Sequence, residues 1–137
     1  MKALTIFDIS SRAMSAQQVR LNAVASNLAN AQTLTSSADK AYQAMRPVFE
    51  TEFSVQQARS GVATVAAVDI QRSQVQPEKR YAPGHPLADP DGYIYASNVD
   101  VNEELVDMME ASRQYQNNIE VLATAKSLIL RTLSVGK

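Results

Sequence analysis

The chain has 137 residues with 13 lysines and arginines, 14 aspartates and glutamates, one histidine and no cysteine. This length suits one domain with a modest core, and a net charge of -1 provides neither a basic face for nucleic acid nor an acidic tail. The absence of cysteine excludes disulfides, thiolate metal sites and a cysteine nucleophile.

The first predicted element is a long amphipathic helix over residues 4–32. We expect no cleavable signal peptide, because the first eighteen residues contain no apolar run of sufficient length and include the charged residues Asp8 and Arg12. Its last turns contain Asn27 and Asn30 among alanines, although asparagine is a poor helix former. An asparagine amide can bond across a close helix contact or close a helix end. We therefore expect Asn27 at an interface, whereas Asn30 fits an interface and a helix C-cap equally well. The apolar heptad positions are Leu4, Phe7, Met14, Leu21 and Leu28.

The middle of the chain is predicted to contain β-strands. Stretches rich in β-branched and aromatic residues predict strands at 48–53 and 61–71, with a shorter strand at 92–95. We expect these strands to form one small antiparallel element. Before them, residues 33–43 are predicted to be a polar hinge, and the prolines of residues 77–92 predict an extended loop that returns the chain to its last element.

The strongest periodicity belongs to a C-terminal helix predicted to begin at residue 101. Asp100 and Glu103 have the spacing of an N-cap and its capping-box acid, and Gly136 follows the last apolar position as a helix stop. The apolar heptad positions of this helix are Val101, Leu105, Met108, Tyr115, Ile119, Leu122, Ile129 and Leu133.

Together these elements predict an α+β fold in which long N- and C-terminal helices form a coiled-coil-like pair. We divide the chain into an N-terminal assembly helix, residues 1–33, a small β-rich middle region with loops, residues 34–100, and a C-terminal assembly helix, residues 101–137. Burying about eight apolar side chains of the first helix yields on the order of 12–24 kcal/mol. Because ordering each residue costs about 1–2 kcal/mol, that helix alone is marginal, and we expect the terminal helices to gain their order in an assembly.

Few residues suggest catalysis or metal binding. His85 lies in a proline-rich turn with no serine or carboxylate at a catalytic spacing. The stretch "DPDG", Asp89 to Gly92, is similar to the start of a calcium loop, but its glycine falls at the fourth position instead of the sixth. Four acids between residues 103 and 110 lie in the first turns of a helix, where carboxylates favour the positive end of the macrodipole. We therefore predict no enzyme activity, no cofactor and no metal.

The two amphipathic helices leave three uses open: a membrane surface, an intramolecular contact or a partner. Membrane binding is disfavoured because the first helix offers only Arg12 and Arg20 as cations and the chain has no tryptophan. We predict no direct membrane insertion, since no segment approaches the ~20 apolar residues of a span. Two hypotheses remain, a subunit whose helices pack in a polymer and a soluble adaptor or chaperone whose helices form a stable hairpin. Protease protection of the free chain separates them.

Particular motifs resemble a known family. The stretch "ASNLANAQT", residues 25–33, resembles the N-terminal signature of the axial proteins of the bacterial flagellum, which build its rod and hook. Further segments, "YQAMRPVFE" at 42–50, "PGHPLADPDGYI" at 83–94, residues 98–126 and the closing "LSVGK", are similar to the proximal rod proteins of that family. The glycine-aromatic step that is common after the signature is missing here, which favours the proximal rod type over hook and distal rod proteins.

The resemblance implies a structural subunit of the periplasmic basal-body rod, the drive shaft that transmits motor torque. It also implies export through the flagellar type III apparatus without a cleaved signal peptide, with other rod proteins and further copies of the chain as partners. In this family the terminal helices form the packed inner tube of the shaft. The residues that we expect at the assembly interface are Leu4, Phe7, Met14, Leu21, Asn27, Leu28, Asn30, Leu105, Met108, Tyr115, Ile119, Leu122, Ile129 and Leu133.

Overall fold

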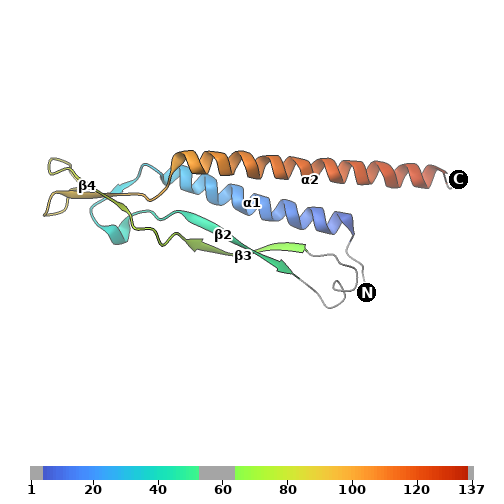
Figure 1. The fold of residues 1–137 in the computed structure, drawn as a ribbon. Coiled ribbons are helices and arrows are strands. Elements are labelled where there is room, and N and C mark those ends of the chain that lie inside the picture. Colours follow the sequence, from blue (N-terminus) through green and yellow to red (C-terminus); the bar gives the residue numbers. More distant parts are fainter. Residues whose placement is uncertain (1–4, 53–63, 136–137) are drawn as a thin grey trace.

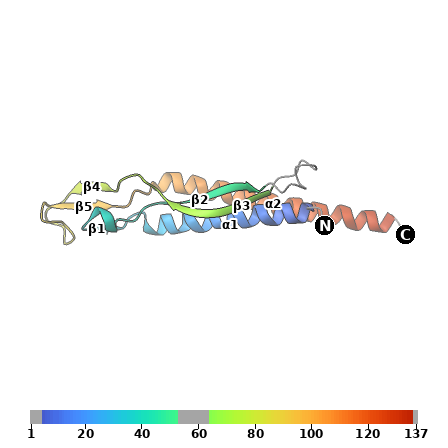
Figure 2. The same ribbon diagram turned by 90° about the horizontal axis from the view of Figure 1, so that it is seen from below.

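The computed structural model describes residues 5–52 and 64–135, which form an elongated α+β fold. Two long helices, α1 (Ile6–Asn30) and α2 (Val101–Val135), lie side by side and run in opposite directions (Figure 1). The hairpin of β2 (Met45–Glu52) and β3 (Thr64–Arg72) also packs along α1, so that α1 lies between α2 and the hairpin (Figure 1). Seen from below, the hairpin lies in front of the two helices (Figure 2). The prediction of long terminal helices with antiparallel β structure between them is confirmed.

Helix α1 follows the predicted range to within two residues at each end, although predicted residue Leu4 lies outside the described residues. A capping box starts the helix, because the Asp8 N–H donates to the Thr5 side chain over 3.3 Å and the Thr5 N–H donates to the Asp8 carboxylate over 3.0 Å. At the other end, the Thr33 N–H and hydroxyl both donate to the Asn30 carbonyl, over 3.1 and 2.8 Å. These bonds satisfy backbone groups that the helix ends would otherwise leave unpaired.

The β structure consists of two separate sheets where we expected one. Strands β2 and β3 form an antiparallel hairpin with a bulge after Val48, and the predicted residues 53 and 61–63 lie outside the described residues. A second antiparallel sheet at the far end of the molecule has the order β1 (Leu34–Thr35), β5 (Tyr93–Ala96), β4 (Glu78–Tyr81).

Two predicted connections therefore contain secondary structure. Part of the expected extended loop, residues 77–92, is the strand β4, and the expected polar hinge contains β1 and a short 3-10 helix over Ala38–Lys40. Both strands reach the sheet by pairing with β5, which lies far from β1 in the sequence and follows β4 after the loop of residues 82–92. Their stability therefore depends on a nonlocal partner more than on their own residues.

Helix α2 begins at the predicted residue, but Glu103, which we expected to act as a capping-box acid, has a different partner. The Asp100 carboxylate accepts from the backbone N–H groups of Asn102 and Glu103 over 2.8 and 3.3 Å, which is the bonding of an N-cap. The Glu103 carboxylate pairs with Arg46 of β2 over 2.9 Å. It therefore links the helix start to the hairpin. The predicted stop, Gly136, lies outside the described residues.

The core of the molecule is made mainly of small side chains. Ala16, Ala23 and Val24 are buried on α1, and Ala111 and Ala125 are buried on α2. Such residues bring backbones close together but bury little apolar area each, so the chain relies on long, close contacts rather than on a thick core. None of the helices in the described ranges is long and apolar enough to cross a membrane.

Candidate functional site

Polar pairs fix the register of α1 against α2. The Asn27 side-chain amide donates to the Glu104 carboxylate over 3.0 Å. The Gln17 side-chain amide donates to the side-chain oxygen Oε1 of Gln114 over 2.7 Å. Position 27 thus lies opposite 104 and position 17 opposite 114, which is the relation expected for two antiparallel helices. A shift of one helix turn would separate both pairs, so this polar contact favours a single alignment.

Asn27 is the centre of the polar contact. Its side chain is fully buried, and its Oδ1 accepts from the Met45 N–H over 2.7 Å and from the Tyr42 hydroxyl over 3.1 Å. Its Nδ2 donates to the Met45 carbonyl over 2.9 Å as well as to Glu104. Asn27 therefore ties α1 to both β2 and α2, and its hydrogen-bonding capacity is used within the chain. Its expected contact with another subunit stays a prediction, because the bonds described here all lie within one chain.

Two arginines surround the first turns of α2. Arg46 of β2 lies 3.0 Å from Glu104 and 3.3 Å from Asp107, in addition to its contact with Glu103. Arg20 of α1 lies 3.0 Å from Asp107 and 3.5 Å from Glu110. The Glu104 side chain is fully buried between Arg46 and Asn27, whereas the Arg46 side chain is 38% exposed.

The sequence reasoning placed these four acids at a helix start, where they indeed lie, but missed their arginine partners. Arg20 and Arg46 belong to two other segments, and no spacing rule relates either of them to α2. The Glu104 Oε1 atom has its arginine at ion-pair distance without a hydrogen bond of good geometry. Because Glu104 is the buried member, its pairing matters more than that of the exposed acids, whose ion pairs contribute little.

Asn30 differs from Asn27 although both belong to the same motif. It is the last residue of α1 and is partly exposed, and its Nδ2 donates to the Ser26 carbonyl of its own helix over 2.8 Å. This bond occupies a carbonyl in the last turns of the helix, which supports the helix-end alternative. The residue with the C-cap position itself is Ala31.

The face of α2 that packs on α1 does not coincide with the predicted heptad. Its buried residues each lie one position before a predicted heptad position. Glu104, Ala111 and Ala125 are the buried residues of α2, and their separations are multiples of seven. Leu105 and Ile119, which the heptad predicts at a helix contact, are each 46% exposed beside that face. The coiled-coil geometry of the pair is therefore not established and stays a prediction.

Many of the expected interface residues remain accessible in the single chain. Phe7 is 39% exposed, Ile129 is 47% exposed and Leu133 is 66% exposed. The structure spreads the expected set along both helices and does not gather it into one pocket. The partly exposed members of the set are Met14, Leu21, Leu28, Asn30, Met108, Tyr115 and Leu122.

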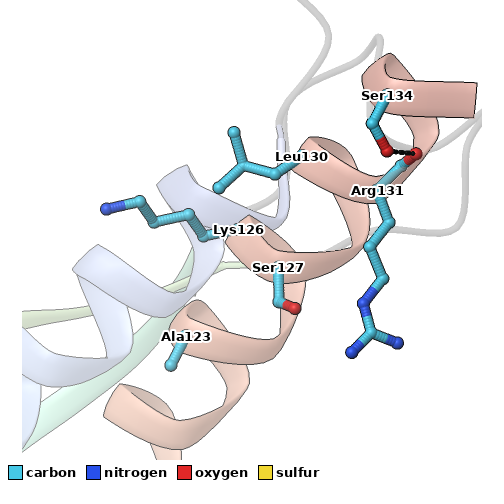
Figure 3. A pocket seen from close by; sticks show the side chains of 6 residues that line it. All are labelled: Ala123, Lys126, Ser127, Leu130, Arg131 and Ser134. Carbon is cyan, nitrogen blue, oxygen red and sulfur yellow. Dashed lines mark hydrogen bonds between the residues drawn. The ribbon is translucent and has the colours of Figure 1, made fainter. Parts of the chain in front are cut away.

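The C-terminal part of α2 extends beyond the start of α1 (Figure 1). Ile6, the first residue of α1, lines a hollow of about 620 Å³ together with Ala125, Leu128 and Ile129. We call residues 126–135 of α2 the overhang. A second hollow, of about 460 Å³, is lined by Ala123 and by five residues of the overhang, so that all six lining residues belong to α2 (Figure 3). A hollow lined by one helix is an open surface rather than an enclosed site for a small molecule.

The sheet at the far end is closed by an ordered turn. The Asp89 carboxylate accepts from the Tyr93 N–H over 2.7 Å and from the Asp91 N–H over 3.0 Å, which is a turn role instead of calcium binding. His85 accepts from the Leu87 N–H over 3.1 Å in the same loop. Within the ranges 5–52 and 64–135, no group of three or more His, Cys, Asp and Glu residues could hold a metal ion.

One exposed pair on β4 has perturbed ionisation. A hydrogen bond from the Arg80 guanidinium over 2.9 Å lowers the pKa of the Glu78 carboxyl, and the same bond raises the pKa of Arg80. Both side chains are 58% exposed. Solvent screening therefore leaves the pair little influence on stability.

Comparison with known proteins shows to which family the chain belongs. Residues 7–33 match the model of the family described as flagella basal body rod protein, and residues 91–135 match the model described as flagellar basal body rod FlgEFG protein C-terminal. The chain is 47% identical to the flagellar basal-body rod protein FlgC of Salmonella typhimurium and 46% identical to that of Escherichia coli O6:H1. It is 37% identical to the FlgC of Buchnera aphidicola from Schizaphis graminum, and each of these three alignments covers 100% of both proteins. The chain therefore belongs to the FlgC family of flagellar basal-body rod proteins and is a structural subunit of the rod.

Proposed function

We propose that the subunit enters the rod through the exposed apolar side chains of its two terminal helices, above all those of the overhang. The observation that carries this proposal is the exposure of four large side chains within six residues: Leu128 is 58% exposed, Ile129 47%, Leu130 57% and Leu133 66%. A contiguous cluster of exposed apolar side chains marks an interaction site, and an assembling subunit buries such a cluster against its neighbours.

The apolar area supports a substantial contribution to assembly. Complete burial of a leucine or isoleucine side chain stabilises a protein by roughly 1.5–3 kcal/mol. Each of these four side chains is about half exposed, so covering the overhang contributes on the order of 3–6 kcal/mol per subunit. The overhang is already helical in the single chain, which differs from the expectation that the terminal helices gain their order in the assembly, so the ordering cost is small.

Four of the expected interface residues, all on α1, form a second contact surface. Phe7, Met14, Leu21 and Leu28 are spaced by seven residues along one side of α1, and all four retain exposed area. Coiled-coil packing of this stripe against a helix of another subunit would bury it. We assign Asn27 to the alignment of the helices within each subunit, because its amide bonds lie inside the chain.

The cellular setting is also proposed from family membership. The chain would leave the cytoplasm through the flagellar type III export apparatus without a cleaved signal, assemble with other rod proteins in the periplasm, and transmit motor torque as part of the shaft. A purely mechanical role without enzyme activity is consistent with the site, in which the charged residues bond one another within the chain.

The experiment replaces Leu133 by aspartate in cells that lack the native subunit. Because Leu133 is 66% exposed, the free variant chain should keep its circular dichroism spectrum and its melting temperature. A buried charge in the rod costs several kcal/mol, so rods should be absent and the cells non-motile.

The matched control is Leu87→Asp, which changes another exposed leucine, 44% accessible, in the loop at the opposite end of the molecule. This variant should assemble and support motility. Normal rods from Leu133→Asp would contradict the proposed role of the overhang, and loss of rods from both variants would mean that the assay detects any added charge.

A further inference from the structure

The overhang has exposed apolar side chains over more than half of its circumference. Successive helical residues point about 100° apart, so Leu128, Ile129 and Leu130 together cover an arc of about 200°, and all three are at least 47% exposed. Leu133 adds a fourth exposed side chain within this arc one turn later. A helix that packs on a single surface needs an apolar stripe about 100° wide. The overhang is therefore wide enough to make apolar contacts on two adjacent sides.

Its charges all have one sign. From Val121 to Val135 the ionisable side chains are Lys126 and Arg131, both basic. They leave the helix on different sides, with Leu130 between them in the view of Figure 3. Neither lies in the last turn of α2, so the helix dipole, whose effect is confined to that turn, does not explain them.

The beginning of α2 has the opposite chemistry. Its apolar side chains are also exposed, with Leu105 at 46%, Val106 at 58% and Met109 at 64%. The carboxylates of Glu103 and Glu110 remain 62% and 51% exposed while they contact their arginines. One end of the same helix thus presents apolar residues with carboxylates, and the other presents apolar residues with cations.

We infer that the overhang inserts beside the first turns of a helix of a neighbouring rod subunit that carries exposed carboxylates among apolar residues, the chemistry at the start of α2 itself. Lys126 and Arg131 pair with carboxylates beside the inserted overhang, while Leu128, Ile129, Leu130 and Leu133 fill the apolar contact. Opposite charges favour this head-to-tail docking, and like charges oppose contact between two overhangs. The inference rests on the proposed function, because it names the partner of the same surface.

Carbodiimide crosslinking of purified, intact basal bodies tests the pairing, because this reagent joins a lysine amine to a carboxylate in contact with it. Mass spectrometry should find Lys126 joined to an Asp or Glu in the first turns of a helix of a second polypeptide. An amine-reactive label should modify exposed Lys40 in the rod but leave Lys126 protected. A Lys126 that reacts freely with the label, or that is joined only to acids outside such a helix start, would overturn the inference.

Charge reversal separates this inference from the proposed function. The double variant Lys126→Glu and Arg131→Glu changes two exposed side chains, so the free chain should fold normally, but its incorporation into rods should fall at least about tenfold. The matched double variant Lys126→Arg and Arg131→Lys keeps both charges and should assemble. If the charge-reversed chain assembles normally while Leu133→Asp does not, the ionic pairing is wrong and the apolar role stands. If both assemble, the proposed function fails as well.

Discussion

Replacing Asn27 by alanine should destabilise the free chain far more than the same change at Asn30. The Asn27 amide makes four hydrogen bonds, two to the Met45 backbone, one to Tyr42 and one to Glu104, and it is fully buried. Asn30 is partly exposed, and its side chain makes one bond, to a carbonyl of its own helix. The two asparagines come from one short motif, so the pair forms a closely matched comparison.

The size of the effect follows from the groups left behind. Alanine at position 27 leaves the Met45 N–H, the Met45 carbonyl and one Glu104 oxygen without this partner. At about 1–3 kcal/mol for each of these three polar groups that loses its hydrogen bond, the cost is on the order of 3–9 kcal/mol. A typical small domain is stable by about 5–15 kcal/mol, so the change removes a large part of the margin. Asn30→Ala should cost about 1 kcal/mol or less, because alanine is a better helix former.

Urea unfolding of both full-length variants, followed by circular dichroism, measures the difference. The urea midpoint of Asn27→Ala should lie well below that of the unchanged chain, whereas the midpoint of Asn30→Ala should lie near that of the unchanged chain. Equal midpoints for the two variants would refute the reasoning, because they would show that the bonds joining α1, α2 and β2 do not stabilise the free chain.

Three further substitutions and one control substitution test local features. Gly92→Ala should lower the melting temperature, at a cost of about 1–3 kcal/mol, because Gly92 has φ 81° and its new Cβ would lie 3.0 Å from the Tyr81 ring. Gly84→Ala, whose Cβ would have open space, should leave the melting temperature unchanged, and equal effects of the two changes would contradict this account. Asp100→Ala should cost about 1 kcal/mol in urea unfolding through loss of the N-cap, and an unchanged midpoint would show that the cap is dispensable. His85→Ala should support normal motility, since its side chain makes one turn bond; a folded but non-motile variant would reveal a role that the geometry does not suggest.

The two helices could be predicted because their signals are local. Heptad spacing and the Asp100 cap depend on residues within a few turns of each other, and the structure keeps those boundaries. The Thr5 and Asp8 capping box was an available signal that the prediction did not use.

Strands β1 and β4 could not be found in the same way. Strand β1 has two residues, and β4, with the sequence "EKRY", has no alternation of buried and exposed side chains because all four are exposed. Both exist because β5 offers backbone partners on its two sides. Such partners are set by the three-dimensional path of the chain, which a local pattern does not contain.

The candidate site was predictable in its apolar part and not in its polar part. Periodicity marks residues such as Leu105 and Ile129, but it does not distinguish the face packed within the chain from the face left exposed. Small and polar residues, among them Ala111 and Glu104, occupy the packed face and carry no hydrophobic signal. The partners of Asn27 come from three other segments, so its central position becomes apparent only in the folded chain.

Hydroxyl-radical footprinting of the free chain and of purified rods tests the central claim most directly. Leu128, Leu130 and Leu133 are 57–66% exposed in the chain and should be oxidised readily there. In the rod their oxidation should fall strongly, because neighbouring subunits enclose the overhang. Val24 of α1, which is 2% exposed, should be protected in both samples. Equal oxidation of the three leucines in free chain and rod would contradict the account, since it would show that assembly leaves the overhang uncovered.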